Sequence, residues 1–140
     1  MPTSVDTNIL VAFLKINDPL TAKAEKLLKK ASTDGELIVC GAVYSELLGM
    51  PGRTEAYLDT FTTEMNIEVD WLIDEKIWRS AGRAFAKYAS RRRKARSEHP
   101  RRILTDFLIG AHAAERGYSL LTLDDGIFRA AFPKLRLLKI

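Results

Sequence analysis

Short apolar runs alternate along the chain with longer segments of helical periodicity. Apolar runs of three to five residues, bounded by glycine or polar residues, are typical of buried strands. Such runs lie at Leu37–Cys40, Ile67–Val69, Ser119–Leu123 and Leu135–Leu138. The stretch 4–6 is too short to be assigned alone, although a helix pattern follows it directly.

Between these runs, apolar residues recur every three or four positions, which predicts amphipathic helices. Asp18 before Pro19 is a typical helix start, and Gly117 a typical helix end. Asp124-Asp125-Gly126 is typical of a turn. The predicted helices begin at Thr7 and at Asp18, and then cover Val43–Leu48, the regions around 57–65 and 73–89, and Thr105–Ala114.

Short apolar strands that alternate with helices indicate an α/β fold in which a parallel sheet is covered on both faces. A length of 140 residues suits one domain spanning 1–140. The apolar fraction of 46% is ordinary for a globular protein.

The chain has no feature that predicts export or a membrane. No apolar run approaches the roughly 18 residues that a membrane helix needs. Asp6 lies where a signal peptide would have a basic and then an apolar stretch. The single cysteine, Cys40, sits in an apolar run and has no internal disulfide partner, which suits a reducing compartment. We therefore expect a cytoplasmic protein with no membrane association.

The positive charge of the chain is concentrated in one segment. Residues 91–102 carry a net charge of +6, whereas the whole chain carries +4. A charge run is often only a solvated surface, but a basic block of this size suggests a polyanionic partner, most commonly nucleic acid. The basic residues are Arg91, Arg92, Arg93, Lys94, Arg96, Arg101 and Arg102.

Four acids lie at positions that a parallel sheet would bring together. Asp6 and Asp124 follow predicted strands, Glu46 lies in the helix after the second strand, and Asp106 opens an otherwise apolar helix. Singly, each has an ordinary explanation as a helix cap, a solvated side chain or part of a turn. Together they would meet at the carboxyl edge of the sheet, where such folds bind ligands.

Four carboxylates at one edge need a cation or protons. Two unit charges about 4 Å apart repel by roughly 4 kcal/mol at a surface-like dielectric. An all-oxygen set of ligands favours Mg²⁺ or Mn²⁺ over zinc, which prefers His and Cys. The sequence therefore predicts a divalent-metal site.

Four segments of the chain resemble the motifs of the PIN-domain family in order and spacing, and the likeness spans essentially the whole chain. Within that family the chain is most similar to the VapC toxins of type II toxin–antitoxin modules. The segments are Val5-Asp6-Thr7-Asn8-Ile9-Leu10, Tyr44-Ser45-Glu46-Leu47-Leu48, the stretch from Leu104 to Ala113, and Leu121-Thr122-Leu123-Asp124.

The resemblance implies a three-layer α/β/α fold around a parallel sheet of four to five strands. It implies that the acids hold Mg²⁺ or Mn²⁺ and cut RNA. It also implies that an antitoxin similar to VapB blocks the acidic site and that the chain itself forms a homodimer. The matching acids are Asp6, Glu46, Asp106 and Asp124. Groups orienting them would be Thr7, Asn8 and Thr122, with helix capping an equal explanation for Thr7.

The last motif departs from the family pattern. The family often has Arg or Asn at the position of Leu123, and an extra acid, Asp125, follows Asp124. Asp124 fits the motif better, but Asp125 could share or replace its role. The choice between them stays open at the level of sequence.

Two other functions fit the same chain. One is a PIN-type nuclease of RNA processing with no toxin role, and the other is a non-catalytic RNA-binding module that kept the fold. The sequence has no Gly-rich phosphate loop and no Gly-x-Ser-x-Gly elbow. Asn8 occupies the place where an aspartyl phosphatase would need an acid. His112, in an apolar helix, is expected to be a packed side chain.

Overall fold

The structure is a computed structural model that describes residues 1–15, 17–95 and 104–138. Five parallel strands form one sheet in the order β3-β2-β1-β4-β5. Leu37 in β2 pairs with Thr3 in β1, which in turn pairs with Ser119 in β4. The strands are β1 (Thr3–Val5), β2 (Leu37–Cys40), β3 (Ile67–Asp70), β4 (Ser119–Leu121) and β5 (Leu137–Leu138).

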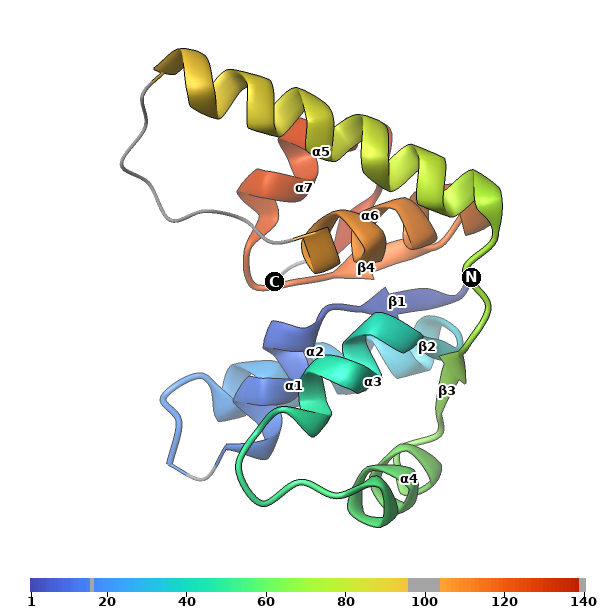
Figure 1. The fold of residues 1–140 in the computed structure, drawn as a ribbon. Helices are drawn as coiled ribbons and strands as arrows, with labels where there is room; N and C mark the ends of the chain where they lie inside the picture. Colours follow the sequence, from blue (N-terminus) through green and yellow to red (C-terminus); the bar gives the residue numbers. More distant parts are fainter. Residues whose placement is uncertain (16, 96–103, 139–140) are drawn as a thin grey trace.

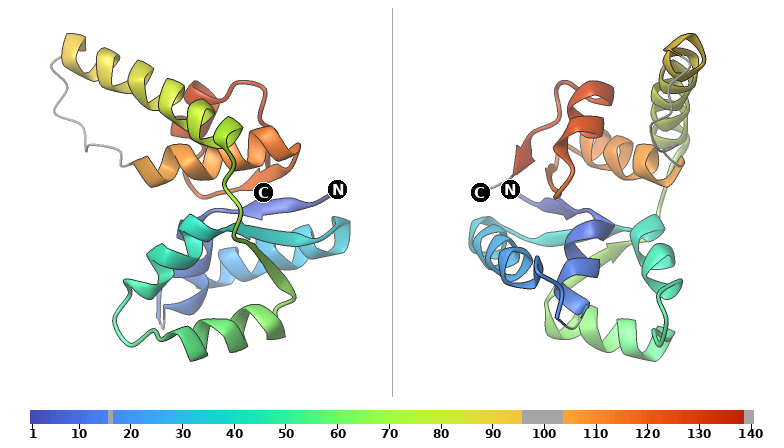
Figure 2. Two further views of the ribbon diagram at one scale, coloured as in Figure 1. Left: turned by 45° about the vertical axis from the view of Figure 1, so that its right-hand side comes forward. Right: turned by 90° about the vertical axis from the view of Figure 1, so that its left-hand side faces the viewer.

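Helices cover both faces of the sheet. Figures 1 and 2 show α1–α4 on one face and α5–α7 on the other. This division follows from right-handed crossovers, because the chain moves outward from β1 to β3 and then returns past β1 to β4 and β5. The helices are α1 (Thr7–Leu14), α2 (Thr21–Asp34), α3 (Gly41–Leu48), α4 (Glu55–Glu64), α5 (Glu75–Ala95), α6 (Leu104–Arg116) and α7 (Asp125–Ala131).

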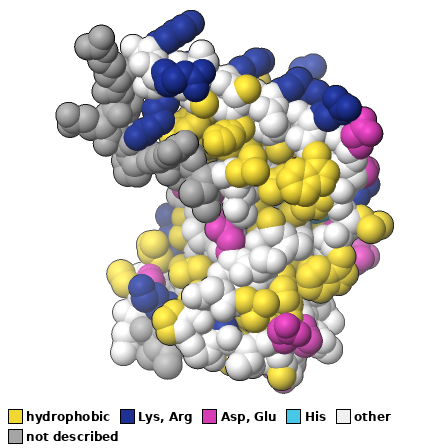
Figure 3. All heavy atoms as spheres, viewed as in Figure 1, with side chains coloured by type: hydrophobic (Ala, Val, Ile, Leu, Met, Phe, Trp, Pro, Cys, Tyr) yellow, Lys and Arg dark blue, Asp and Glu magenta, His cyan; other side chains and the backbone are white. Residues whose placement is uncertain are grey.

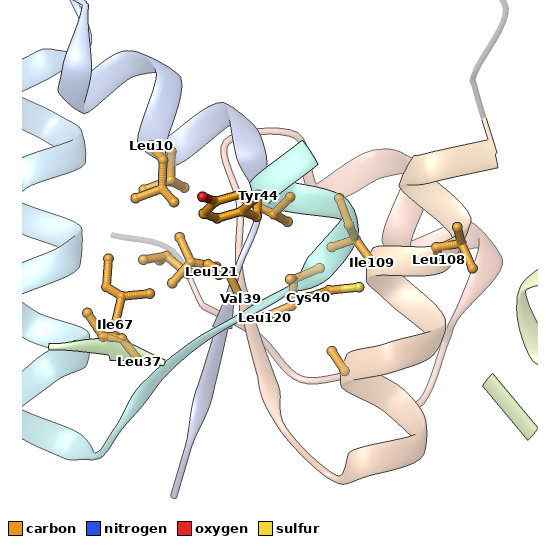
Figure 4. Packing of buried hydrophobic residues seen from close by; sticks show 14 of the residues in the cluster. Leu10, Leu37, Val39, Cys40, Tyr44, Ile67, Leu108, Ile109, Leu120 and Leu121 are labelled. Atoms are coloured by element: carbon orange, nitrogen blue, oxygen red, sulfur yellow. The ribbon is translucent and has the colours of Figure 1, made fainter. Parts of the chain in front are cut away.

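The core lies between the sheet and each helical layer. The residues of β1, β2 and β4 are all buried, so both faces of these strands are covered. Leu121 points toward Leu10 of α1, whereas the sulfur of Cys40 points toward α6 (Figure 4). Burial raises the pKa of the Cys40 thiol, which fits a structural cysteine. None of the helices in the described part of the chain is long and apolar enough to cross a bilayer.

The α/β class and the parallel sheet predicted from the sequence are confirmed, with differences at the ends of elements. The helix expected at Asp18 begins at Thr21, because the Asp18 carboxylate instead accepts the Leu20 N–H at 2.7 Å in a turn. The turn predicted at 124–126 is wrong, because Asp125 begins helix α7. Phe128 of this helix is almost fully buried and anchors it. A seven-residue helix has too few periodic positions to be visible in the sequence.

Candidate metal centre

Asp6 occupies the point where the order of the strands reverses. The chain leaves β1 for β2 on one side, while β4 lies on the other side of β1. Such a reversal leaves a crevice at the carboxyl ends of the strands, where open α/β sheets bind ligands. Asp6 follows β1 and is the N-cap residue of α1, but its side chain accepts no capping hydrogen bond. Helix capping therefore does not account for the acid at this position.

The carboxyl group of Asp6 is buried, with 4% of the residue exposed. Burial raises the pKa of Asp6 from 3.8 to about 6, and the charges of Asp106 and Glu46 add to the rise, while the hydroxyl of Thr122 opposes it. Asp106 and Glu46 are therefore near enough to disfavour the charged form of Asp6. A cation between them would remove that penalty.

A hydrogen-bond network joins the ends of β1 and β4. Thr122 Oγ1 donates to Asp6 Oδ2 at 2.8 Å and accepts from the backbone N–H of Asp124 at 3.0 Å. The Asn8 side chain spans the same gap, since its carbonyl accepts the Leu123 N–H at 3.2 Å and its amide donates to Thr122 at 3.4 Å. The network fixes the orientation of Asp6 and the start of the segment that carries Asp124.

Glu46 is brought to the site by α3. Its Oε1 accepts a 2.6 Å hydrogen bond from the hydroxyl of Thr7, the first residue of α1. The side chains of Tyr44 and Leu47 on the same helix are buried. Glu46 itself is only half-buried, so its carboxylate is held near Asp6 while part of it remains accessible to solvent.

Asp106 lies in the first turn of α6. The next residue, Phe107, is fully buried and stacks on Phe85 of α5 at a ring distance of 5.4 Å. Tyr88 contacts the same Phe107 ring, also at 5.4 Å. These rings fix the amino end of α6 against α5, and with it the backbone position of Asp106. The contact also accounts for Tyr88 as a packing residue.

The four acids line one open cavity of about 450 Å³. Its lining residues are Asp6, Thr7, Asn8, Val11, Ala12, Asp18, Leu20, Glu46, Asp106, Leu123, Asp124, Ile127 and Phe128. Asp125 is absent from this lining, and its carboxylate pairs with Arg129 one turn later in α7 at 2.8 Å. The geometry therefore favours Asp124 over Asp125 as the fourth acid.

The acids surround the cavity without closing on one point. Within the described residues, no three His, Cys, Asp or Glu side chains are close enough together to enclose a metal ion as they stand. Glu46 and Asp124 are half-buried and line the open cavity, whereas Asp6 is buried and accepts a hydrogen bond from Thr122. The possible metal-binding atoms are all carboxylate oxygens. Burial disfavours the charged form of Asp6, which a bound cation would stabilise. The residues therefore fit Mg²⁺ or Mn²⁺.

The basic segment begins on α5. Arg91, Arg92, Arg93 and Lys94 lie in its last turns, with Arg92 half-buried and the other three exposed. Figure 3 shows basic side chains gathered over α5 at the upper edge of the molecule. The other three basic residues expected to bind RNA, Arg96, Arg101 and Arg102, lie outside the described residues.

Two features of this region were not predicted from the sequence. The cavity extends past the acids to an apolar wall, to which α7 contributes Ile127 and Phe128; nothing in the sequence signals α7, so this wall could not be foreseen. The second feature is an ion-pair group at the end of β3. Its members are Asp70, Asp74, His112 and Arg116.

His112 is fully buried, and its Nε2 lies 2.9 Å from Asp70 Oδ2. Partial burial acts to raise the pKa of Asp70, but the contacts with His112 and Arg116 outweigh it and hold this pKa below its ordinary value. The group joins α6 to the end of β3, and none of its members lines the acidic cavity. His112 is therefore a packed side chain, as expected.

Comparisons with known proteins agree with this architecture. Residues 4–133 match the sequence model of the PIN domain. No match was found among the curated proteins compared with the chain.

Several solved structures share the fold at low sequence identity. VapBC2 of Rickettsia felis, solved with a DNA fragment from its promoter, aligns with a TM-score of 0.66 and 20% identity over 99% of this chain and 98% of that chain. VapBC-1 of nontypeable Haemophilus influenzae aligns with a TM-score of 0.66 and 21% identity over the same fractions. Mycobacterium tuberculosis VapC20, described as a Sarcin-Ricin loop cleaving toxin, aligns with a TM-score of 0.62 and 17% identity over 96% and 98%.

Proposed function

Because the chain belongs to the PIN-domain family, we propose that it is a metal-dependent endoribonuclease and the toxin of a type II toxin–antitoxin module. One observation carries the proposal: four carboxylates from four separate segments line a single cavity at the reversal point of the sheet. A protein without catalysis or metal binding gains nothing from burying Asp6 beside two other acids, since burial and the two neighbouring charges all disfavour the charged form of Asp6.

In the proposed site, Asp6 and Asp106 are the principal ligands of Mg²⁺ or Mn²⁺. When bound, the cation would polarise the phosphate and neutralise the charge that develops on the leaving oxygen. Thr122 holds Asp6 in one orientation by donating to Oδ2.

The two remaining acids have distinct tasks. Glu46, held by the Thr7 hydroxyl through Oε1, positions the attacking water and accepts its proton. Asp124 completes the ring of carboxylates, and its backbone is fixed by the bond from its N–H to Thr122. Attack by water forms a new P–O bond, the phosphodiester bond to the leaving oxygen breaks, and the leaving oxygen takes up a proton.

Binding of the RNA backbone is assigned to the basic end of α5. Tyr88 of α5 packs against Phe107, the residue that follows Asp106 in α6. Exposed Arg91, Arg93 and Lys94 therefore lie on a helix that packs beside the helix carrying Asp106. Within the part of the chain that the structure describes, no basic residue lines the cavity. The described basic side chains that we assign to the RNA backbone therefore lie outside the cavity. We include Arg92, Arg96, Arg101 and Arg102 in this surface on the basis of the sequence.

An antitoxin similar to VapB is the proposed protein partner. The structures that share this fold include VapBC2 of Rickettsia felis and a FitAB structure bound to a DNA fragment, and another is described as a toxin-antitoxin complex from Klebsiella pneumoniae. We propose that this chain likewise acts as a homodimer in the cytoplasm. The buried, unpaired Cys40 suits a reducing compartment.

Cleavage of purified RNA tests the proposal. The wild-type protein, freed of antitoxin and treated with EDTA, should cut RNA only after Mn²⁺ or Mg²⁺ is restored, and an Asp106→Asn variant should be inactive under the same conditions. Circular dichroism would establish that both proteins are folded. Absence of cleavage by folded, metal-loaded wild type across total cellular RNA would overturn the assignment.

A further inference from the structure

The acids occupy only part of the cavity. The remaining lining is mainly apolar. Val11 and Ala12 come from α1, Leu20 from the segment before α2, Leu123 from the segment after β4, and Ile127 from α7. We call this part the apolar arm, defined by Val11, Ala12, Leu20, Leu123 and Ile127.

The apolar arm leaves apolar surface in contact with solvent. Leu20 is 42% exposed, and Val11, Leu123 and Ile127 are half-buried. Apolar side chains that remain partly exposed around a concavity gain by binding a ligand that covers them. Phe128, the remaining apolar residue of the lining, is buried and lies beside Gly110 of α6.

The charge around the arm disfavours a second phosphate. The charged groups that line the cavity are all acids, and Asp18 and Asp124 are the two nearest to the arm along the chain. Among the described residues, no Lys or Arg lines the cavity. One Asp18 oxygen is already engaged by the Leu20 N–H at 2.7 Å. The occupant of the arm is therefore a neutral group attached to whatever the acids bind.

We propose that the apolar arm binds the nucleobase of the nucleotide adjoining the scissile phosphate; the inference rests on the proposed ribonuclease function. Thr7 and Val11 are four residues apart on α1, a rise of about 6 Å. That span is similar to the separation between a phosphate and the base of its own nucleotide. A nucleotide carries a charged phosphate at one end and a flat, largely apolar base at the other. The cavity likewise combines a proposed cation site with an apolar wall.

The arm acts mainly by apolar contact with the face of the base. The arm therefore contributes to substrate binding and to the positioning of the phosphate over the acids. A side chain of the antitoxin is the competing occupant. The nucleobase is favoured because it is covalently joined to the phosphate that the acids are proposed to bind, so that one ligand fills both parts of the cavity.

Abasic ribonucleotides test the inference. Cleavage sites are first mapped on a pool of single-stranded oligoribonucleotides, and the best substrate is then made with one abasic riboside at each position around the cut. The three proteins compared are wild type, Leu20→Ala and, as a matched control, Leu72→Ala. Leu72 is 72% exposed and lies outside the cavity.

For wild type and Leu72→Ala, one abasic position beside the cut should lower kcat/KM about tenfold, as expected for emptying an apolar pocket. For Leu20→Ala, the intact substrate should already be cut more slowly, and the abasic change at that position should cost about twofold or less. Ile127→Ala should behave as Leu20→Ala does.

Two results would overturn the inference while leaving the nuclease intact. One is cleavage that is insensitive to every abasic position, and the other is an equal abasic loss in wild type and Leu20→Ala. The latter result, together with weaker antitoxin binding by Leu20→Ala, would assign the arm to the protein partner. If no oligonucleotide is cut by metal-loaded wild type, the proposed function itself fails.

Discussion

Thr122 Oγ1 donates a 2.8 Å hydrogen bond to Asp6 Oδ2, and so joins the end of β4 to the end of β1 at the point where the strand order reverses. The bond lowers the pKa of Asp6 against the opposing effects of burial and of the neighbouring acids. Its presence means that the charged form of Asp6, which a cation requires, is supported by a neutral donor that cannot itself compete for the metal.

Replacement of Thr122 by valine should therefore weaken the site without reshaping it. Valine keeps the volume but removes the donor, and a hydrogen bond to a charged group is worth about 1.5–3 kcal/mol. The pKa of Asp6 should rise further, so that the acid limb of the pH profile of kcat/KM moves to higher pH and activity at pH 6 falls about sevenfold or more. Thr122→Ser keeps the hydroxyl, so the acid limb of its pH profile should lie at the same pH as that of wild type. An unchanged limb in Thr122→Val would show that this hydrogen bond does not tune Asp6.

Asp124 and Asp125 form a matched pair for mutation. Asp124 lines the cavity, whereas Asp125 pairs with Arg129 on the surface of α7. Asp124→Asn should lower kcat/KM by tenfold or more, and Asp125→Asn should change it by less than twofold. The ion pair between Asp125 and Arg129 should contribute no more than about 0.5 kcal/mol to the free energy of unfolding measured in urea. A larger loss of activity from Asp125→Asn than from Asp124→Asn would reverse the assignment.

The pKa of Asp6 makes the metal-free protein less stable as pH rises. An acid whose pKa is about 6 in the folded protein and 3.8 when unfolded stabilises the fold fully below pH 3.8. That contribution is lost as pH increases from 3.8 through about 6. Between pH 4.5 and 7.5 the loss amounts to about 2 kcal/mol.

Urea unfolding in EDTA at pH 4.5 and 7.5 measures this effect. Asp6→Asn lacks the titrating group. As pH increases between these values, its free energy of unfolding should therefore rise by about 2 kcal/mol relative to that of wild type. Saturating Mn²⁺ should restore wild type at pH 7.5 and have little effect on Asp6→Asn. Parallel pH profiles for the two proteins would show that Asp6 is not destabilised by burial.

Salt dependence tests the basic end of α5. Each phosphate contact to single-stranded RNA contributes about −0.7 to the slope of log affinity against log salt. Combined replacement of Arg91, Arg93 and Lys94 by Gln should therefore make the slope shallower by about 2. The control is Arg79→Gln, because this exposed residue lies on the same helix but is paired with Glu75. An equal slope for the triple variant and wild type would exclude these three side chains from the RNA surface.

The layers and the order of the elements could be read from the sequence, because buried parallel strands and amphipathic helices have distinct periods. The four acids could be placed at one edge for the same reason, since residues that follow parallel strands meet there. The choice between Asp124 and Asp125 could not, because it depends on helix α7, which begins at Asp125 itself. The extent of the domain over 1–140 stays a prediction, and the family match covers 4–133.

The family resemblance named Thr122 as a group that orients the acids. Its specific partner, Asp6, and the apolar arm were beyond sequence reasoning for a different reason. Both depend on residues more than a hundred positions apart along the chain, such as Val11 and Ile127. Only the register of β1 against β4 brings them together. A single sequence does not specify that register when the strands are only three residues long.

Binding of Mn²⁺ in the absence of RNA tests most directly the claim that these acids form one metal site. Calorimetric titration of the EDTA-treated protein at pH 7.5 should give saturable binding to wild type and to Glu115→Gln. Glu115 is an acid at the other end of α6 that pairs with Lys76. Binding to Asp106→Asn should be at least tenfold weaker. Equal affinity in Asp106→Asn and wild type, or no saturable binding to folded wild type, would contradict the account.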